Sequence, residues 1–134
     1  MKRILILAAL AVAAWQLTST EASAHAPAGE VQTIAFGSRA VELTLDHPGD
    51  QEWAGSVTDV VVSGGPVLED LIGVPYPGPE KMTISLRTSQ ALDGYAGTAG
   101  CSHVVCHIRL LPDFDDTTLL HELTHAWTQS FRNR

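Results

Sequence analysis

The sequence predicts an α+β domain in which a small mixed sheet, ending in an edge strand, precedes one C-terminal helix. Two observations predict this class. Between residues 31 and 111, short runs rich in β-branched or alternating apolar residues are separated by turn-forming residues. From residue 117 to residue 127, apolar residues instead recur at helical spacing. The chain has 134 residues without internal repeats or a long linker, so we expect a single folded domain.

The N-terminus has the three parts of a secretory signal peptide. Lys2 and Arg3 precede an apolar run over residues 4–15, and Ala22-Ser23-Ala24 is an A-x-A cleavage signature. The apolar run is shorter than the roughly 20 residues that span a bilayer, which argues against a stable membrane anchor. We therefore expect a signal peptide over residues 1–24, cleavage after Ala24, and a secreted or periplasmic mature domain over residues 25–134.

Five runs of the mature chain are expected to form strands: 31–36, 40–45, 53–62, 81–87 and 103–111. The third is expected to end at the Ser-Gly-Gly-Pro of residues 63–66, followed by one or two helical turns over 67–72. Three segments rich in glycine or proline are expected to be turns or loops: 47–50, 75–79 and 94–100.

The charge of the mature domain argues against nucleic acid as a partner. The whole chain has a formal net charge of −7 with neutral histidines. Loss of Lys2, Arg3 and Glu21 with the signal peptide would make it −8. An acidic domain without a basic patch is poorly suited to a phosphate backbone.

Cys101 and Cys106 are the two cysteines of the chain. An even number in an oxidising compartment favours a disulfide, while free thiols remain an alternative. A metal cluster formed with His103 and His107 is a third alternative. It is disfavoured because alternate residues of a strand point to opposite faces of the sheet.

The segment 117–127 is expected to form a capped amphipathic helix. Asp115 or Asp116 can accept hydrogen bonds from the first backbone N–H groups. An inner face is formed by apolar residues at helical spacing: Leu119 or Leu120, Leu123 and Trp127. Apart from Glu122, residues 118–127 are uncharged, as a buried metal-binding helix requires.

His121, Glu122 and His125 form an HExxH motif within this helix. Two histidines four residues apart lie one helical turn apart on the same side, so both imidazoles can bind one Zn²⁺. Glu122 is placed beside the open position of such a site, where it can act as general base and then as general acid.

Residues 118–127 resemble the zincin metallopeptidases, and among them the gluzincin or peptidase MA-like group. The order of elements from residue 81 onward resembles the same group more loosely. The resemblance implies Zn²⁺ bound by His121 and His125, Glu122 as catalytic base, and hydrolysis of peptide or protein substrates. It also implies that the strand 103–111 is the sheet edge that receives the substrate backbone by strand addition.

The sequence departs from this family after His125, where residues 126–134 contain no further metal-binding side chain. Three explanations remain open: a truncated zincin domain, a third ligand from upstream, or a non-catalytic metal-binding module. Five residues are candidates for an upstream ligand: His103, His107, Asp113, Asp115 and Asp116. A copper site at His25, the expected mature N-terminus, is a separate form of the metal-binding module.

Overall fold

The computed structural model describes residues 29–47 and 51–132. Its seven elements are β1 (Val31–Phe36), β2 (Arg39–Asp46), α1 (Gln51–Ile72), β3 (Lys81–Leu86), β4 (Gly97–Cys101), β5 (Val105–Leu110) and α2 (Asp116–Arg132). The expected signal peptide, its cleavage site, His25 and residues 48–50 of the expected turn lie outside the described residues.

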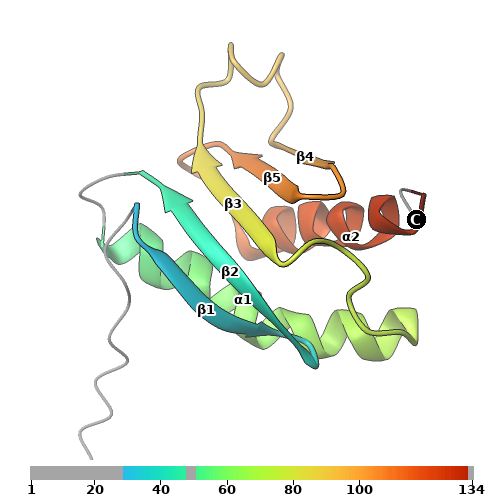
Figure 1. Ribbon diagram of the computed structural model, residues 1–134. Coiled ribbons are helices and arrows are strands. Elements are labelled where there is room, and N and C mark those ends of the chain that lie inside the picture. The colour runs from blue at the N-terminus through green and yellow to red at the C-terminus, as the bar shows by residue number, and fades with distance from the viewer. Residues whose placement is uncertain (1–28, 48–50, 133–134) are drawn as a thin grey trace, which may run out of the picture.

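The five strands form one mixed sheet in the order β1-β2-β3-β5-β4 (Figure 1). β2, β3 and β5 run parallel to one another, while β1 and β4 pair antiparallel with β2 and β5 respectively. α2 follows the last strand. The predicted class, a small mixed sheet followed by a C-terminal helix, is therefore confirmed.

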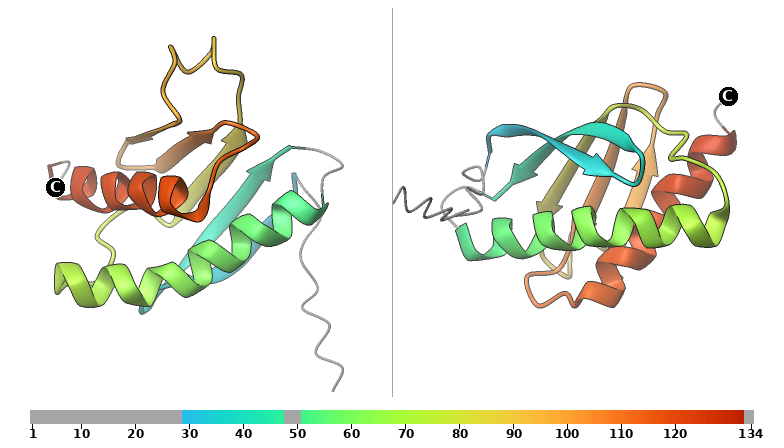
Figure 2. Two further views of the ribbon diagram at one scale, coloured as in Figure 1. Left: turned by 180° about the vertical axis from the view of Figure 1, so that it is seen from behind. Right: turned by 90° about the horizontal axis from the view of Figure 1, so that it is seen from below.

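Both helices cover the same face of the sheet, as the two views of Figure 2 show. The core between the helices and the sheet is made of aliphatic and aromatic side chains. Its most deeply buried members are at most 1% exposed and include Phe36, Leu43, Met82, Ile108 and Trp127. Burial of this apolar surface is the main force that holds the helices on the sheet. Among the described helices, none combines the length and apolar character needed to cross a membrane.

The edge of the sheet differs from the predicted edge. The run 103–111 forms β5, which lies between β3 and β4, so the prediction that it is the edge strand was wrong. The edge strand next to β5 is β4, formed by Gly97-Thr98-Ala99-Gly100-Cys101, most of which was expected to be a loop; β1 is the edge strand at the other end of the sheet. Its small residues have weak intrinsic preference for strands, but pairing with β5 in the register Ala99↔Ile108 provides the hydrogen bonds.

α1 is the second element that differs from the prediction. Residues 53–62 were predicted to form a strand ending at Gly64-Gly65-Pro66, but 51–72 form one continuous helix. The expected helical turns over 67–72 are its last part. Most of its buried residues follow helical spacing. They are Trp53, Ala54, Gly55, Val57, Thr58, Val60, Val61, Gly64, Gly65 and Leu68. The β-branched valines favour a strand only weakly, and packing of this face on the sheet outweighs that preference.

The Gly64-Gly65 pair permits close approach within this packing rather than ending a strand. A Cβ atom at Gly65 would lie 2.3 Å from the Gly37 nitrogen and 2.9 Å from the Phe36 carbonyl carbon. At Gly64 it would lie 2.4 Å from Cδ2 of Leu120 on α2. The absence of a side chain therefore lets α1 approach both the β1–β2 hairpin and α2.

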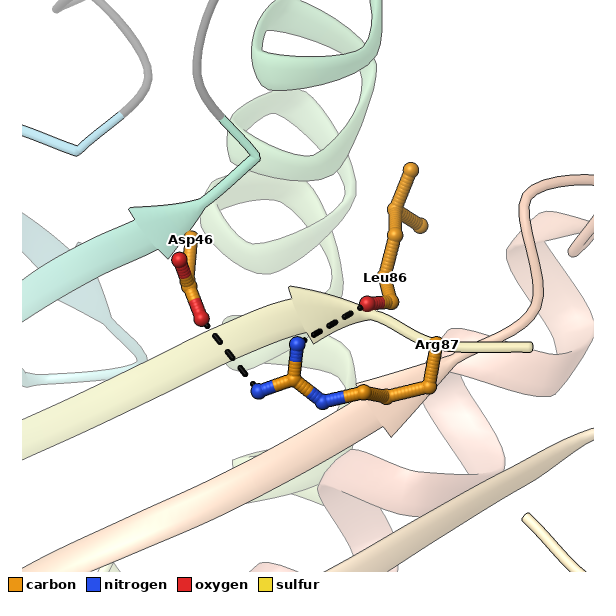
Figure 3. A network of polar contacts seen from close by, with 3 residues as sticks. All are labelled: Asp46, Leu86 and Arg87. Carbon is orange, nitrogen blue, oxygen red and sulfur yellow. Dashed lines mark hydrogen bonds and ion pairs between the residues drawn. The ribbon is translucent and has the colours of Figure 1, made fainter. Parts of the chain in front are cut away.

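Adjacent ends of β2 and β3 are joined by one ion pair at the surface (Figure 3). Arg87 Nη2 lies 3.3 Å from Asp46 Oδ2, and Arg87 Nη1 donates to the Leu86 carbonyl oxygen at 3.2 Å. Because both charged side chains are exposed, such a pair contributes about 0–1 kcal/mol. It marks the end of β3 but adds little to the stability of the fold.

Candidate metal centre and its edge strand

The N-terminal cap of α2 is Asp115, as one of the two predicted possibilities stated. Its Oδ1 accepts hydrogen bonds from the Thr118 backbone nitrogen at 2.7 Å and from Thr118 Oγ1 at 2.8 Å. The backbone bond and then the side-chain bond lower the pKa of Asp115 below its ordinary value. The cap fixes where the helix begins, and therefore which residues of the motif face outward.

The inner face of α2 fixes the rotation of the helix. Leu119, Leu123 and Trp127 are fully buried, whereas Leu120 is only partly buried. The Trp127 ring packs edge-on against Phe36 and Tyr76, with ring centroids 5.0 and 5.5 Å apart. With this face held in the core, the opposite face of the helix is directed away from it.

His121 and His125 lie on that exposed face and meet at their tips. Their Nε2 atoms are 3.0 Å apart, and their ring centroids are 4.5 Å apart. Two nitrogens bound to one tetrahedral Zn²⁺ at 2.0–2.1 Å lie about 3.4 Å from each other. The observed separation is that of a hydrogen bond between the two rings and is about 0.4 Å shorter than this value, so a small opening of the pair would let both imidazoles bind one small cation.

Glu122 lies on the neighbouring face of the helix, between the histidine pair and the buried face, and packs against the sheet. It is only 6% exposed. Burial raises the pKa of Glu122 above its ordinary value, against the smaller lowering effects of His121 and His125. A carboxyl group of this kind, close to two imidazoles, has the character expected of a general base.

Gly97 of the edge strand forms the other side of the Glu122 pocket. A Cβ atom at Gly97 would lie 2.9 Å from Cγ and 3.1 Å from Oε1 of Glu122. Glu122 is therefore packed directly against the backbone of β4. The HExxH helix therefore lies beside an edge strand, but this strand is β4 and not the predicted run 103–111.

A third protein ligand does not join the histidine pair within residues 29–47 and 51–132. No group of three or more His, Cys, Asp or Glu side chains in that part of the chain could hold a metal ion. His107 lies on an exposed position of β5, where the neighbouring Cys106 and Ile108 are the residues that face the core. His103 is exposed in the turn between β4 and β5. Asp113, Asp115 and Asp116 precede or begin α2, and Asp115 is its cap.

Cys101 and Cys106 form the predicted disulfide, which links β4 to β5 at a directly opposed pair. A disulfide sulfur does not provide a thiolate ligand, so the alternative metal cluster of these cysteines with His103 and His107 is not formed. The Tyr76 hydroxyl donates to Cys106 Sγ at 3.1 Å, since the disulfide sulfur has no proton to give. Burial raises the pKa of Tyr76 to about 12.

Gln129 is a site residue that the sequence did not indicate. It lies on α2, four residues after His125, and its side-chain amide contacts β4 twice. Nε2 donates to the Ala99 carbonyl oxygen at 3.1 Å, and Oε1 accepts from the Cys101 backbone nitrogen at 3.2 Å. The sequence did not indicate Gly97 as a site residue either, because a run of small residues is typical of a loop.

Comparison with known proteins adds no family assignment to this geometry. No protein-family model matches the chain, and it is not significantly similar to any curated protein or solved structure in the searches. The residues of α2 and β4 themselves are therefore the features of this chain that point to a function.

Proposed function

We propose that this chain is a zinc-dependent metallopeptidase whose site is formed by α2 and the edge strand β4. The observation that carries the proposal is the arrangement of the HExxH residues. His121 and His125 direct two nitrogens 3.0 Å apart to the exposed face, while Glu122 is buried beside Gly97 of the sheet edge. Two metal ligands, a shielded carboxyl group and a strand edge thus lie within one small region.

His121 and His125 would hold the metal through their Nε2 atoms. Imidazole nitrogen is a common ligand of Zn²⁺, and four-residue spacing on a helix suits one ion. When bound, Zn²⁺ supplies Lewis-acid activation of a water molecule and of the scissile carbonyl group. The two histidines would hold the ion at the exposed face of α2.

Glu122 takes the proton from the attacking water and delivers it to the leaving amine nitrogen. Its packing against Gly97 restricts the movement of the carboxyl group toward the strand. The same packing excludes solvent from one side of the carboxyl group.

The substrate would lie along the outer edge of β4. β5 pairs on both sides, with β3 and with β4, so it has no open edge for a peptide. β4 ends the sheet, and an extended peptide can add to such an edge through backbone hydrogen bonds. This mode of binding recognises the peptide backbone. Gly97, which packs on Glu122, is itself buried, so the peptide would lie against the more exposed residues of β4 that follow it.

A second candidate function is metal binding without catalysis. It is favoured by one observation, the presence of only two convergent ligands among the described residues. A catalytic zinc site commonly has three protein ligands and an open position. An ion held by two histidines alone would bind more weakly and would remain mostly hydrated.

The first experiment separates these two functions. The purified mature chain is loaded with Zn²⁺, bound metal is measured by mass spectrometry after desalting, and cleavage of fluorescently labelled casein is followed. We expect about one Zn²⁺ per chain, lost in the double variant H121A/H125A. Glu122→Gln should keep the metal and lose cleavage by about 10²-fold or more. His107→Ala is the matched control, because this histidine is exposed on β5 away from the pair.

Each result has a defined meaning. Cleavage by Glu122→Gln at the wild-type rate would refute the assigned base. Metal binding that depends on His121 and His125, without cleavage by the wild-type chain, would establish the binding module instead. Metal retained in the double variant would refute both functions.

A further inference from the structure

The histidine pair of α2 supplies only half of the ligands that a tetrahedral Zn²⁺ takes. The Nε2 atoms of His121 and His125 are 3.0 Å apart at the exposed face of the helix. Within residues 29–47 and 51–132, no further His, Cys, Asp or Glu side chain joins them in a group of three. Zn²⁺ in proteins most often has four ligands. Water, or side chains from outside this part of the chain, would therefore fill the remaining positions.

The pair lies near the middle of an exposed stripe along α2, on the outside of the molecule (Figure 2). The stripe consists of residues at helical spacing, which are Thr117, His121, His125, Thr128 and Arg132. From Thr117 to Thr128 it has no acidic or basic side chain other than the two histidines. A second protein surface can therefore approach the histidines without burying an unpaired carboxylate or ammonium group.

The charges at the two ends of α2 have opposite signs. An acidic turn begins the helix, with Asp113, Asp115 and Asp116 all exposed, and the exposed Arg132 ends it. Asp115 and Arg132 lie at nearly equal distances from the centre of the histidine pair, about 12 and 14 Å along the helix axis. Two copies of α2 that cross antiparallel at the histidines therefore bring Arg132 of each copy close to the acidic turn of the other.

We propose that two copies of this chain pair antiparallel through α2, and that His121 and His125 of both copies together hold one Zn²⁺. This inference rests on zinc binding by the histidine pair, which both functions proposed above share. Four imidazoles complete a tetrahedral set, and a two-fold axis gives both copies the same contacts. A second copy is favoured over an unrelated partner because the uncharged middle and the oppositely charged ends of α2 are complementary to themselves.

Pairing closes the site to catalysis. A structural zinc site has four protein ligands, whereas a catalytic site keeps one position for water or substrate. The paired form therefore holds the metal without hydrolysing peptides, and the single chain is the form with open positions. The ratio of metal to protein decides between the two forms, because an excess of Zn²⁺ lets each chain bind an ion of its own.

Sedimentation velocity during a Zn²⁺ titration tests the pairing. The purified chain is freed of metal with a chelator, and its mass in solution is measured as Zn²⁺ is added. The chain should be single without metal and fully paired at about one Zn²⁺ for every two chains. In a large excess of Zn²⁺, single chains should reappear, each with its own ion.

The outcomes of this titration separate the inference from the proposed function. Zn²⁺ bound by chains that stay single at every ratio would overturn the inference and leave the proposed function intact. Pairs that contain about one Zn²⁺ per chain, or that form without metal, would overturn it as well, because the ion would then not be shared. A chain that binds no Zn²⁺ would refute the proposed function and the inference together.

Variants of exposed residues check the ligands and the orientation. H121A/H125A should stay single at every ratio. Arg132→Glu should weaken pairing by about tenfold, because an attraction at each end of the interface becomes a repulsion. Arg109→Glu is the matched control, since it makes the same change of charge at an exposed position of β5, and it should pair as the wild-type chain does. Equal weakening by the two charge changes would overturn the antiparallel arrangement.

Co²⁺ in place of Zn²⁺ reports the number of nitrogen ligands directly. Four imidazoles hold Co²⁺ in a tetrahedral site that absorbs visible light strongly, whereas a mostly hydrated ion is octahedral and absorbs weakly. Strong absorption should reach its maximum at about one Co²⁺ for every two chains and be absent in H121A/H125A. Weak absorption at every ratio would overturn the shared four-histidine site.

Discussion

Adding one methyl group at Gly97 tests the contact on which the proposed site depends. The new Cβ atom of Gly97→Ala would lie 2.9 Å from Glu122 Cγ, whereas ordinary contact begins at 3.4 Å. Because these are side-chain atoms, either the Glu122 side chain must move or β4 and α2 must separate locally, in each case by about 0.5 Å, the difference between these two distances. Gly100→Ala, on the same strand, is the matched control, because a Cβ atom at that position would have no other atom within 4 Å.

The expected magnitude follows from two opposing effects. Replacing glycine by alanine in a strand stabilises by about 0.5–1 kcal/mol in both variants. Overpacking costs about 1–3 kcal/mol in Gly97→Ala alone. The difference between the two variants isolates this overpacking cost, and each 1 kcal/mol corresponds to roughly 4–8 °C in Tm for a domain near this size.

The assay is urea denaturation followed by circular dichroism, together with kcat/KM for casein peptides. A displacement of 1 Å in a catalytic site costs about 10²-fold, so a shift of about half that size should lower kcat/KM by about tenfold in Gly97→Ala. Zinc binding should be unchanged, because His121 and His125 lie on the exposed face of α2 and do not contact Gly97. Equal free energies of unfolding for the two variants would refute the packing of Glu122 against the edge strand.

Three further predictions concern the fold around the site. Gly65→Ala should destabilise the fold by about 1–3 kcal/mol, because the new Cβ atom meets backbone atoms. Gly64→Ala should change the free energy of unfolding little, because the new Cβ atom meets the Leu120 side chain, which can rotate. Equal effects of the two substitutions in chemical denaturation would contradict this packing. Replacing both Cys101 and Cys106 by serine should cost on the order of 2 kcal/mol from the short closed loop, a loss that reduction of the wild-type chain should reproduce. Asp115→Ala should lower Tm at neutral pH. Because its folded pKa is lowered, this contribution is present above the ordinary aspartate value of about 4 and is lost as the pH falls through the folded value; a Tm difference independent of pH would contradict the cap.

The sequence by itself determined the features that depend on neighbours along the chain. The HExxH spacing places His121 and His125 one turn apart on any α-helix, and Asp115 can cap α2 because Thr118 follows three residues later. Alternation of apolar and polar residues identified β1, β2 and β3 to within about one residue. These features arise from local geometry, which is the same in most folded environments.

Only the tertiary structure decided the features that depend on contacts between distant segments. Gly64 and Gly65 resemble the end of a strand until the hairpin and α2 pack against them, and residues 97–101 resemble a loop until β5 pairs with them. The identity of the edge strand, and the hydrogen bonds of Gln129 with residues 28 to 30 positions away, follow from that packing. Burial and strand pairing act across the whole chain, so local patterns of residues do not contain them.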